Sequence, residues 1–141
     1  MVKLIVGEKG SGKTKKLISL VNETAKVSKG NVVCIERGDS LRFDIKNNIR
    51  LIDIKEYGVK GDDGYYSFIC GLLAGNYDIT EIFGDATFKI LCGKDSKDFE
   101  ALASFIEKVE AIVEKNGPEI TFTISCAAEE IPERIKKYIV E

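Results

Sequence analysis

The chain has 141 residues, a formal net charge of −2 at pH 7 and no histidine. A chain of this length can bury a sizeable core, and its 44% hydrophobic and 31% charged residues exclude a disordered chain. The charge gives no electrostatic case for nucleic acid as the main partner. The absence of histidine excludes a Ser-His-Asp triad, a Cys-His pair and a His-ligated zinc site.

The first apolar run follows Met1 almost at once, without a charged leader and cleavage site before it. No apolar run approaches the roughly 20 residues that a membrane helix needs. We therefore expect a cytoplasmic protein without a membrane span. The four cysteines form no Cys-x-x-Cys pair, so we expect buried thiols that pack as small hydrophobic groups.

The first third of the chain predicts a buried strand, a helix and a second buried strand. Residues 2–6 are a short apolar run that ends at Gly7, which is typical of a buried strand. Residues 14–26 carry apolar side chains at helical spacing, and residues 32–35 form the next short apolar run.

The segment 38–64 is predicted to be an insertion that contains a β-hairpin. Two short apolar stretches, 42–45 and 49–54, flank Asn47 and Asn48, a pair that favours a tight turn. Such a hairpin would extend the edge of a sheet.

The rest of the chain alternates between helical and strand patterns. The clearest helix ends at an Asn-Gly-Pro triplet, which is a strong helix stop. The expected elements are a helix over 65–74, a strand over 79–83, a helix over 98–115, a strand over 120–124 and a final helix over 131–140.

This alternation predicts an α/β fold. Strands separated by helices of crossover length favour a mainly parallel sheet of about five strands, covered by helices on both faces. No internal repeat, low-complexity tract or linker divides the chain, so residues 1–141 are predicted to form a single domain.

One stretch between the first strand and the first helix fits the pattern G-x-x-x-x-G-K-[ST] at every fixed position. Its glycines let backbone N–H groups turn inward around an anion, and the following helix points its positive end at the same place. The alternative is a glycine-rich turn without a ligand. The phosphate-binding reading assigns Gly7, Glu8, Lys9, Gly10, Ser11, Gly12, Lys13, Thr14 and Lys15 to the nucleotide.

This stretch resembles the Walker A motif of the P-loop NTPases. The resemblance implies the three-layer α/β/α P-loop NTPase fold, with the hairpin as an addition, and it implies ATP and Mg²⁺ as ligands. Lys13 would reach the outer phosphates and Thr14 would give its hydroxyl to Mg²⁺. The subclass found in partitioning and division-site ATPases has a lysine directly after the first loop glycine, where this chain has Glu8.

The resemblance also implies an acidic residue at the end of an apolar strand, which helps to hold Mg²⁺. Asp85, after the strand over 79–83, is the first candidate for this Walker B acid, and Asp53 is the second. Hydrolytic members commonly place a glutamate next, where this chain has Ala86, whose methyl group cannot orient water. The resemblance therefore implies ATP binding with weak or partner-dependent hydrolysis.

Ser125 follows the last predicted strand, where RecA-like ATPases have a polar residue that senses the γ-phosphate. Lys13, Asp85 and Ser125 are accordingly the expected catalytic residues. Ser125 has a second reading, in which it only begins the turn toward the last helix.

Several functions stay open. The first is a small ATP-binding protein of the additional-strand, RecA-like branch, acting as a nucleotide-dependent switch, with a protein partner or as a homo-oligomer. A GTP-binding protein would usually need Asn-Lys-x-Asp, and residues 92–95 read Cys-Gly-Lys-Asp. A small-molecule kinase would usually carry a basic lid after the Walker B strand, and no arginine lies there. A non-enzymatic interaction module with a decayed site is the fourth reading.

Overall fold

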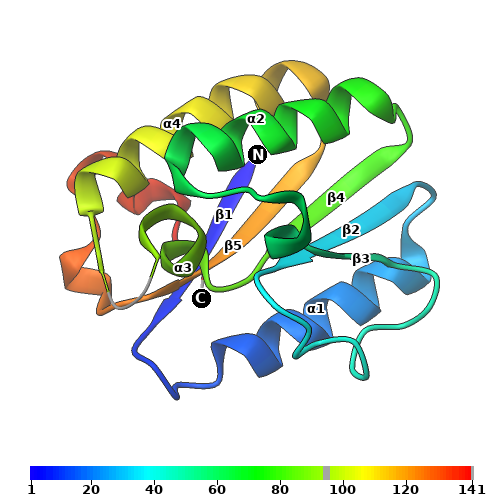
Figure 1. The fold of residues 1–141 in the computed structure, drawn as a ribbon, viewed down its shortest axis with the longest axis horizontal. Helices are drawn as coiled ribbons and strands as arrows, with labels where there is room; N and C mark the ends of the chain where they lie inside the picture. Colours follow the sequence, from blue (N-terminus) through cyan, green and yellow to red (C-terminus); the bar gives the residue numbers. More distant parts are fainter. Residues whose placement is uncertain (94–95, 141) are drawn as a thin grey trace.

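The computed structural model describes residues 1–93 and 96–140 and shows an α/β fold built on one five-stranded sheet (Figure 1). The strand order is β1-β5-β4-β2-β3, and each neighbouring pair is parallel. The strands are β1 Val2–Gly7, β2 Asn31–Glu36, β3 Arg50–Asp53, β4 Ile79–Gly84 and β5 Glu119–Ser125. The prediction of a mainly parallel α/β sheet is confirmed.

Helices cover both faces of this sheet (Figure 1). The helix α1 lies on one face, and α2 and α4 lie side by side on the other. The α-helices are α1 Lys13–Val27, α2 Gly61–Gly75, α3 Thr87–Cys92 and α4 Phe99–Asn116. Three short 3-10 segments complete the described chain: η1 Ile54–Tyr57, η2 Ala128–Glu130 and η3 Glu133–Tyr138.

The two faces of the sheet bury different kinds of side chain. On the face of α2 and α4, three aromatic rings from Tyr65, Phe105 and Phe122 pack with centroids 4.9 to 5.9 Å apart. On the face of α1, Leu17 and Val21 lie one helical turn apart and are fully buried. The apolar periodicity that predicted these helices is therefore the pattern of their buried faces.

The predicted helix over 98–115 is confirmed as α4. The carboxylate of Asp98 accepts a hydrogen bond from the Ala101 N–H at 3.0 Å and caps the helix N-terminus. Gly117 follows the last turn with φ of 89°, a conformation that glycine adopts without strain.

Among the described residues, no helix is long and apolar enough to cross a membrane.

The predicted hairpin is wrong. Residues 42–45 form turns, and β3 runs parallel to β2 rather than antiparallel to a hairpin partner. Ile45 and Ile49 are apolar because they pack into the core on the α1 face. Residues 37–49 provide the long connection that two adjacent parallel strands require. The segment 38–64 is thus a part of the sheet and its flanks.

The predicted final helix is also wrong, since residues 133–138 form the 3-10 segment η3. The chain then meets the outer side of β1, where Ile139 bridges to Leu4 and the Val140 N–H donates to the Leu4 carbonyl at 2.9 Å. A helix running to residue 140 would leave this side of β1 without backbone partners.

The short helix α3 was not predicted. It has six residues, of which Thr87, Phe88, Ile90 and Leu91 are buried, so it shows no amphipathic period.

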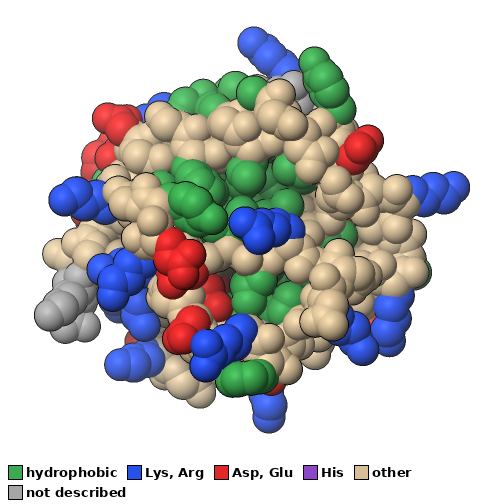
Figure 2. Space-filling model, turned by 45° about the vertical axis from the view of Figure 1, so that its right-hand side comes forward, with side chains coloured by type: hydrophobic (Ala, Val, Ile, Leu, Met, Phe, Trp, Pro, Cys, Tyr) green, Lys and Arg blue, Asp and Glu red, His purple; other side chains and the backbone are tan. Residues whose placement is uncertain are grey.

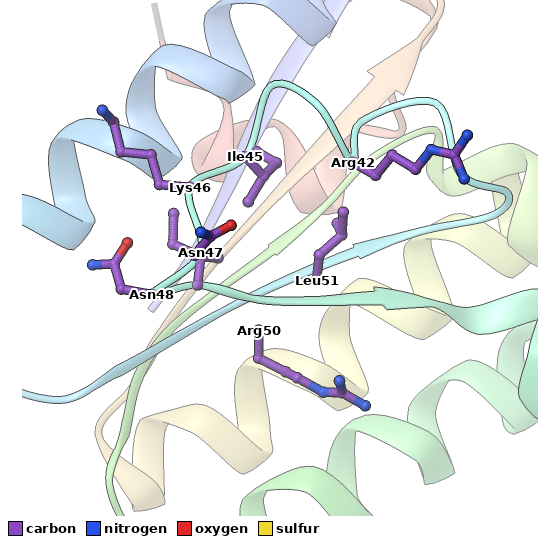
Figure 3. A pocket seen from close by; sticks show the side chains of 8 residues that line it. Arg42, Ile45, Lys46, Asn47, Asn48, Arg50 and Leu51 are labelled. Carbon is purple, nitrogen blue, oxygen red and sulfur yellow. The ribbon is translucent and has the colours of Figure 1, made fainter.

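Two hollows flank β3, and neither shares a lining residue with the site described below. One has a volume of about 580 Å³, lies between β3 and α2, and has Phe68 and Leu72 among its lining residues. Figure 2 shows hydrophobic side chains gathered in a hollow of the surface. The other, of about 480 Å³, is formed by the loop before β3, with Arg42 and Lys46 at its rim (Figure 3).

Candidate functional site

The glycine-rich segment forms an open loop between β1 and α1. Gly10 and Gly12 have φ of 83° and 90°, which only glycine adopts without strain. Gly12 caps α1 without a side-chain hydrogen bond, and no acidic residue lies in the first turn. The positive end of the α1 dipole therefore faces the loop, and the helix has no acidic residue in its own first turn.

Lys13 lies across this loop. Its Nζ donates to the Glu8 carbonyl oxygen at 3.0 Å, and the Ser11 N–H donates to the same oxygen at 3.1 Å. A Cβ on Gly7 would displace the Ser11 hydroxyl, so the start of the loop packs closely against Ser11. The ammonium group is thus held inside the loop by a neutral carbonyl rather than by a carboxylate.

Asp85 follows β4 directly and is 8% exposed. Its N–H donates to the Ile35 carbonyl of β2 at 2.9 Å, which fixes the backbone at this point. The Thr123 hydroxyl donates to Asp85 Oδ1 at 2.6 Å and accepts the Ala86 N–H at 2.9 Å. The carboxylate is therefore oriented by β5, the strand next to β4.

The structure brings Thr14 and Asp85 together. The Thr14 hydroxyl lies 3.3 Å from Oδ2 and 3.5 Å from Oδ1 of Asp85, although the two residues are 71 positions apart in the sequence. Hydroxyl and carboxylate oxygens are hard ligands of the kind that Mg²⁺ prefers. The two oxygen donors thus have the chemistry that suits Mg²⁺, although the described residues contain no group of three or more acidic, cysteine or histidine side chains that would hold a metal without further ligands.

A cavity of about 360 Å³ joins the loop to the ends of β4 and β5. Asp85 is the one carboxylate among its described lining residues, against four lysines. Those lysines are Lys9, Lys13, Lys89 and Lys97, and the hydroxyl groups on the wall belong to Thr14, Ser40, Ser96, Thr123 and Ser125. The cavity is thus strongly positive and can bind an anion.

Ser125 also lies on the wall of this cavity. It is the last residue of β5 and pairs in register with Gly7, the last residue of β1. The following N–H, of Cys126, donates to the Gly7 carbonyl at 3.1 Å. Lys15 belongs to α1 and is exposed outside the lining of the cavity.

Asp53, the second candidate for the acid, has a different position. Its Oδ1 accepts hydrogen bonds from the Gly38 N–H at 2.8 Å and the Lys55 N–H at 3.0 Å, and it does not line the cavity. These bonds cap η1 and hold the loop after β2, which is a structural role. Lys94 and Asp95, the end of the tetrapeptide weighed for guanine recognition, lie outside the described residues.

Sequence reasoning missed Thr123, whereas Glu36 with Arg37 was considered only as a pair that could bind the acceptor of a kinase. Thr123 lies two residues before Ser125, so a polar side chain on the same face of a buried strand was the available signal. Glu36 ends β2 and is 3% exposed, with its carboxylate accepting from the Ser40 hydroxyl at 2.9 Å and the Leu41 N–H at 3.1 Å. Burial raises the pKa of Glu36 above its ordinary value.

The thiols near the site are not nucleophiles. Burial raises the pKa of Cys126 to about 11 and that of Cys34 to about 12, where the negative charges of Asp85 and Glu36 add to the effect. Both groups therefore stay protonated at neutral pH. All four cysteines are free.

The chain matches no protein-family model and no curated protein. What the site can do chemically therefore follows from the loop, the Thr14–Asp85 contact and the lysine-lined cavity.

Proposed function

We propose that the chain binds ATP with Mg²⁺ in this cavity and hydrolyses it weakly, or only with a partner, as a P-loop protein of the additional-strand branch. The observation that carries this proposal is the approach of the Thr14 hydroxyl to the Asp85 carboxylate beside the glycine loop, at 3.3 Å. A turn that merely connected β1 to α1 would not require this contact.

The strand order supports the same proposal. In the additional-strand branch, a strand separates the one that leads into the loop from the one that ends at the acid. Here β5 lies between β1 and β4. It also supplies Thr123, which orients Asp85, and Ser125 on the cavity wall.

Each residue then has a defined role. The N–H groups of the loop and the start of α1 hold the phosphates, and Lys13 exchanges the Glu8 carbonyl for a phosphate oxygen. Thr14 and Asp85 would hold Mg²⁺, and the ion would supply positive charge that neutralises the outer phosphates. Ser125 lies where it can contact the outermost phosphate from β5.

Weak turnover follows from the groups around Asp85. Ala86 lies on the cavity wall in the position that follows the acid, and its methyl group cannot accept a proton from water. The described lining residues include no carboxylate besides Asp85, which is proposed to hold the metal. This set of lining residues is consistent with a nucleotide-dependent switch or a partner-activated ATPase. The cytoplasmic location expected from the sequence stays a prediction.

The kinase alternative finds less support. Arg134 is held by Glu100 and Glu107 at 2.8 to 2.9 Å, and the described lining of the cavity includes no arginine. Arg42 and Arg50 line the separate hollow beside β3.

Calorimetric titration of Mg-ATP tests the proposal directly. Lys13→Ala is expected to weaken ATP binding by about tenfold or more, because it removes a charge-assisted hydrogen bond to phosphate. Lys16→Ala is the matched control, since Lys16 is an exposed lysine of the same helix outside the cavity. Equal affinity of Lys13→Ala and the wild type would refute the proposed site. GTP titrated in the same way identifies the base.

Phosphate release is measured on the same proteins. Slow release that disappears in Lys13→Ala makes the chain an ATPase, whereas binding without release makes it a switch or a partner-dependent enzyme.

A further inference from the structure

We propose that Lys89 and Lys97 bind the terminal phosphate of the nucleotide from the part of the cavity wall formed by α3 and the segment before α4, so that the site prefers a triphosphate to a diphosphate. This inference rests on the proposed function and assigns the selectivity of that same site to two further residues. Both lysines line the cavity that holds Lys13, Thr14 and Asp85.

The helix α3 holds Lys89 in place. Its neighbours Phe88 and Ile90 are buried, so Lys89 is the exposed position between two anchored residues. The Phe88 ring packs edge-on against Phe99 of α4, with centroids 5.3 Å apart. The Gly93 N–H closes the helix on the Lys89 carbonyl at 3.2 Å. The backbone that carries Lys89 is therefore rigid, while its ammonium group can reach a ligand.

Lys97 approaches from the start of α4. It directly precedes Asp98, whose carboxylate caps that helix. The charges of Lys97 and Lys13 both act on the Cys126 thiol, where they oppose the rise in pKa that burial causes. Cys126 is bonded through its N–H to Gly7 at the start of the loop. Lys97 and Lys13 are thus close enough to the same group for their charges to converge on it.

The direction of approach selects the terminal phosphate. Asp85, proposed to hold Mg²⁺ at the outer phosphates, is separated from the start of α3 by Ala86 alone. Lys89 therefore lies on the Mg²⁺ side of the cavity. The attraction between these lysines and the ligand is strongest for a phosphate that extends past the loop. A diphosphate lacks this phosphate.

The charges of the two lysines also favour an anion. Among the described residues, neither Lys89 nor Lys97 forms an ion pair, whereas Lys3, Lys108 and Lys136 each have a carboxylate within 3.3 Å. Among the described lining residues, four lysines face the single carboxylate of Asp85, and the repulsion between them is reduced when a multiply charged anion binds.

The experiment is a calorimetric comparison of Mg-ATP with Mg-ADP on wild type, Lys89→Gln, Lys97→Gln and the double variant. Each single change is expected to weaken ATP binding by about five- to tenfold, as lost contacts of a flexible charge to phosphate do. ADP binding is expected to stay within about twofold. Lys89→Arg keeps the charge and should retain the preference for ATP, and Lys16→Gln controls for the loss of a positive charge elsewhere.

Two outcomes overturn the inference. Equal losses for ATP and ADP would mean that the lysines only add a general positive field, and unchanged ATP affinity would mean that they do not contact the ligand. Both outcomes leave the proposed function intact as long as Lys13→Ala weakens binding. A wild-type chain that binds neither nucleotide would instead remove the proposed function itself. Urea unfolding of each variant verifies that these exposed substitutions leave the fold unchanged.

Discussion

Polar groups are hydrogen-bonded differently at the amino ends and at the carboxyl ends of the strands. At the amino ends, polar groups satisfy one another within the protein. The hydroxyls of Ser28 and Thr80 lie 2.6 Å apart beside the Glu81 carboxylate, so one hydroxyl donates to the other and the second donates to the carboxylate. Nearby, the Val2 N–H donates to the Glu110 carboxylate at 2.8 Å.

At the carboxyl ends, several groups lack such partners. Ala86 has a φ of 50°, an unfavourable conformation for a residue other than glycine. The hydroxyls of Tyr65 and Thr87 are buried without a hydrogen-bond partner in the described structure. The amino ends of the strands are therefore arranged for stability, while the carboxyl ends retain backbone strain and buried hydroxyls without partners, as sites that bind ligands often do.

The largest expected effect comes from the amino ends. A Cβ on Gly30 would collide with Thr80 Cγ2 and with the Asp78 carbonyl oxygen, which is backbone and cannot rotate away. We expect Gly30→Ala to lower the free energy of unfolding by about 2–3 kcal/mol. Gly71→Ala in α2, where no atom lies within 4 Å of the added methyl group, should raise it by about 0.5–1 kcal/mol.

Urea unfolding measures both glycine variants. Under conditions where Gly30→Ala remains folded, its affinity for Mg-ATP should equal that of the wild type, because the amino ends are proposed to have no part in binding. Lower ATP affinity of folded Gly30→Ala would contradict the proposal that nucleotide binding depends on the carboxyl ends of the strands and not on the amino ends.

Thr123→Val tests the carboxyl ends. It removes the hydroxyl that orients Asp85, so we expect Mg²⁺-dependent ATP affinity to fall by about 10- to 100-fold. Thr121→Val, two residues earlier on the same strand, is the matched control and should bind as the wild type does. Titrations with and without Mg²⁺ separate the effects, since a loss of equal size in the absence of Mg²⁺ would contradict a role through the metal.

Two threonine variants compare how a hydroxyl at each end of the strands affects the free energy of unfolding. Thr87→Val removes a buried hydroxyl without a partner, so we expect the free energy of unfolding to rise by about 1 kcal/mol. Thr80→Val removes a hydroxyl bonded to Ser28 and Glu81, so it should fall by about 1 kcal/mol. Thermal and urea unfolding give both values, and changes of the same sign would contradict the contrast.

The smallest change is expected in the pH dependence of stability. Burial raises the native pKa of Glu36, so the native state holds this proton more tightly than the unfolded state. The resulting stabilisation is fully present below the unfolded pKa of about 4.3 and is lost as pH rises through the raised native pKa. The stability of wild type relative to Glu36→Gln should therefore decrease as the pH rises from about 4 to 7. A pH-independent difference between the two proteins would show that Glu36 titrates normally.

Much of the local structure follows from the sequence alone. Short apolar runs ended by glycine mark the strands β1 and β4, and apolar spacing with an Asn-Gly-Pro stop marks α4. The loop was predicted from its G-x-x-x-x-G-K-[ST] pattern, and Asp85 from the resemblance to P-loop NTPases, which implies an acid at the end of an apolar strand. These features depend on neighbours within a few residues, which the sequence displays directly.

The tertiary structure alone decided the rest. The parallel direction of β3, the Thr123–Asp85 bond and the shared wall of Lys89 and Lys97 depend on which strands lie side by side. Local patterns carry no information about such partners, because the free energy of these contacts arises between residues far apart in the chain. The hairpin prediction failed for this reason: apolar residues that pack into a core and those that pair as strands give the same local signal.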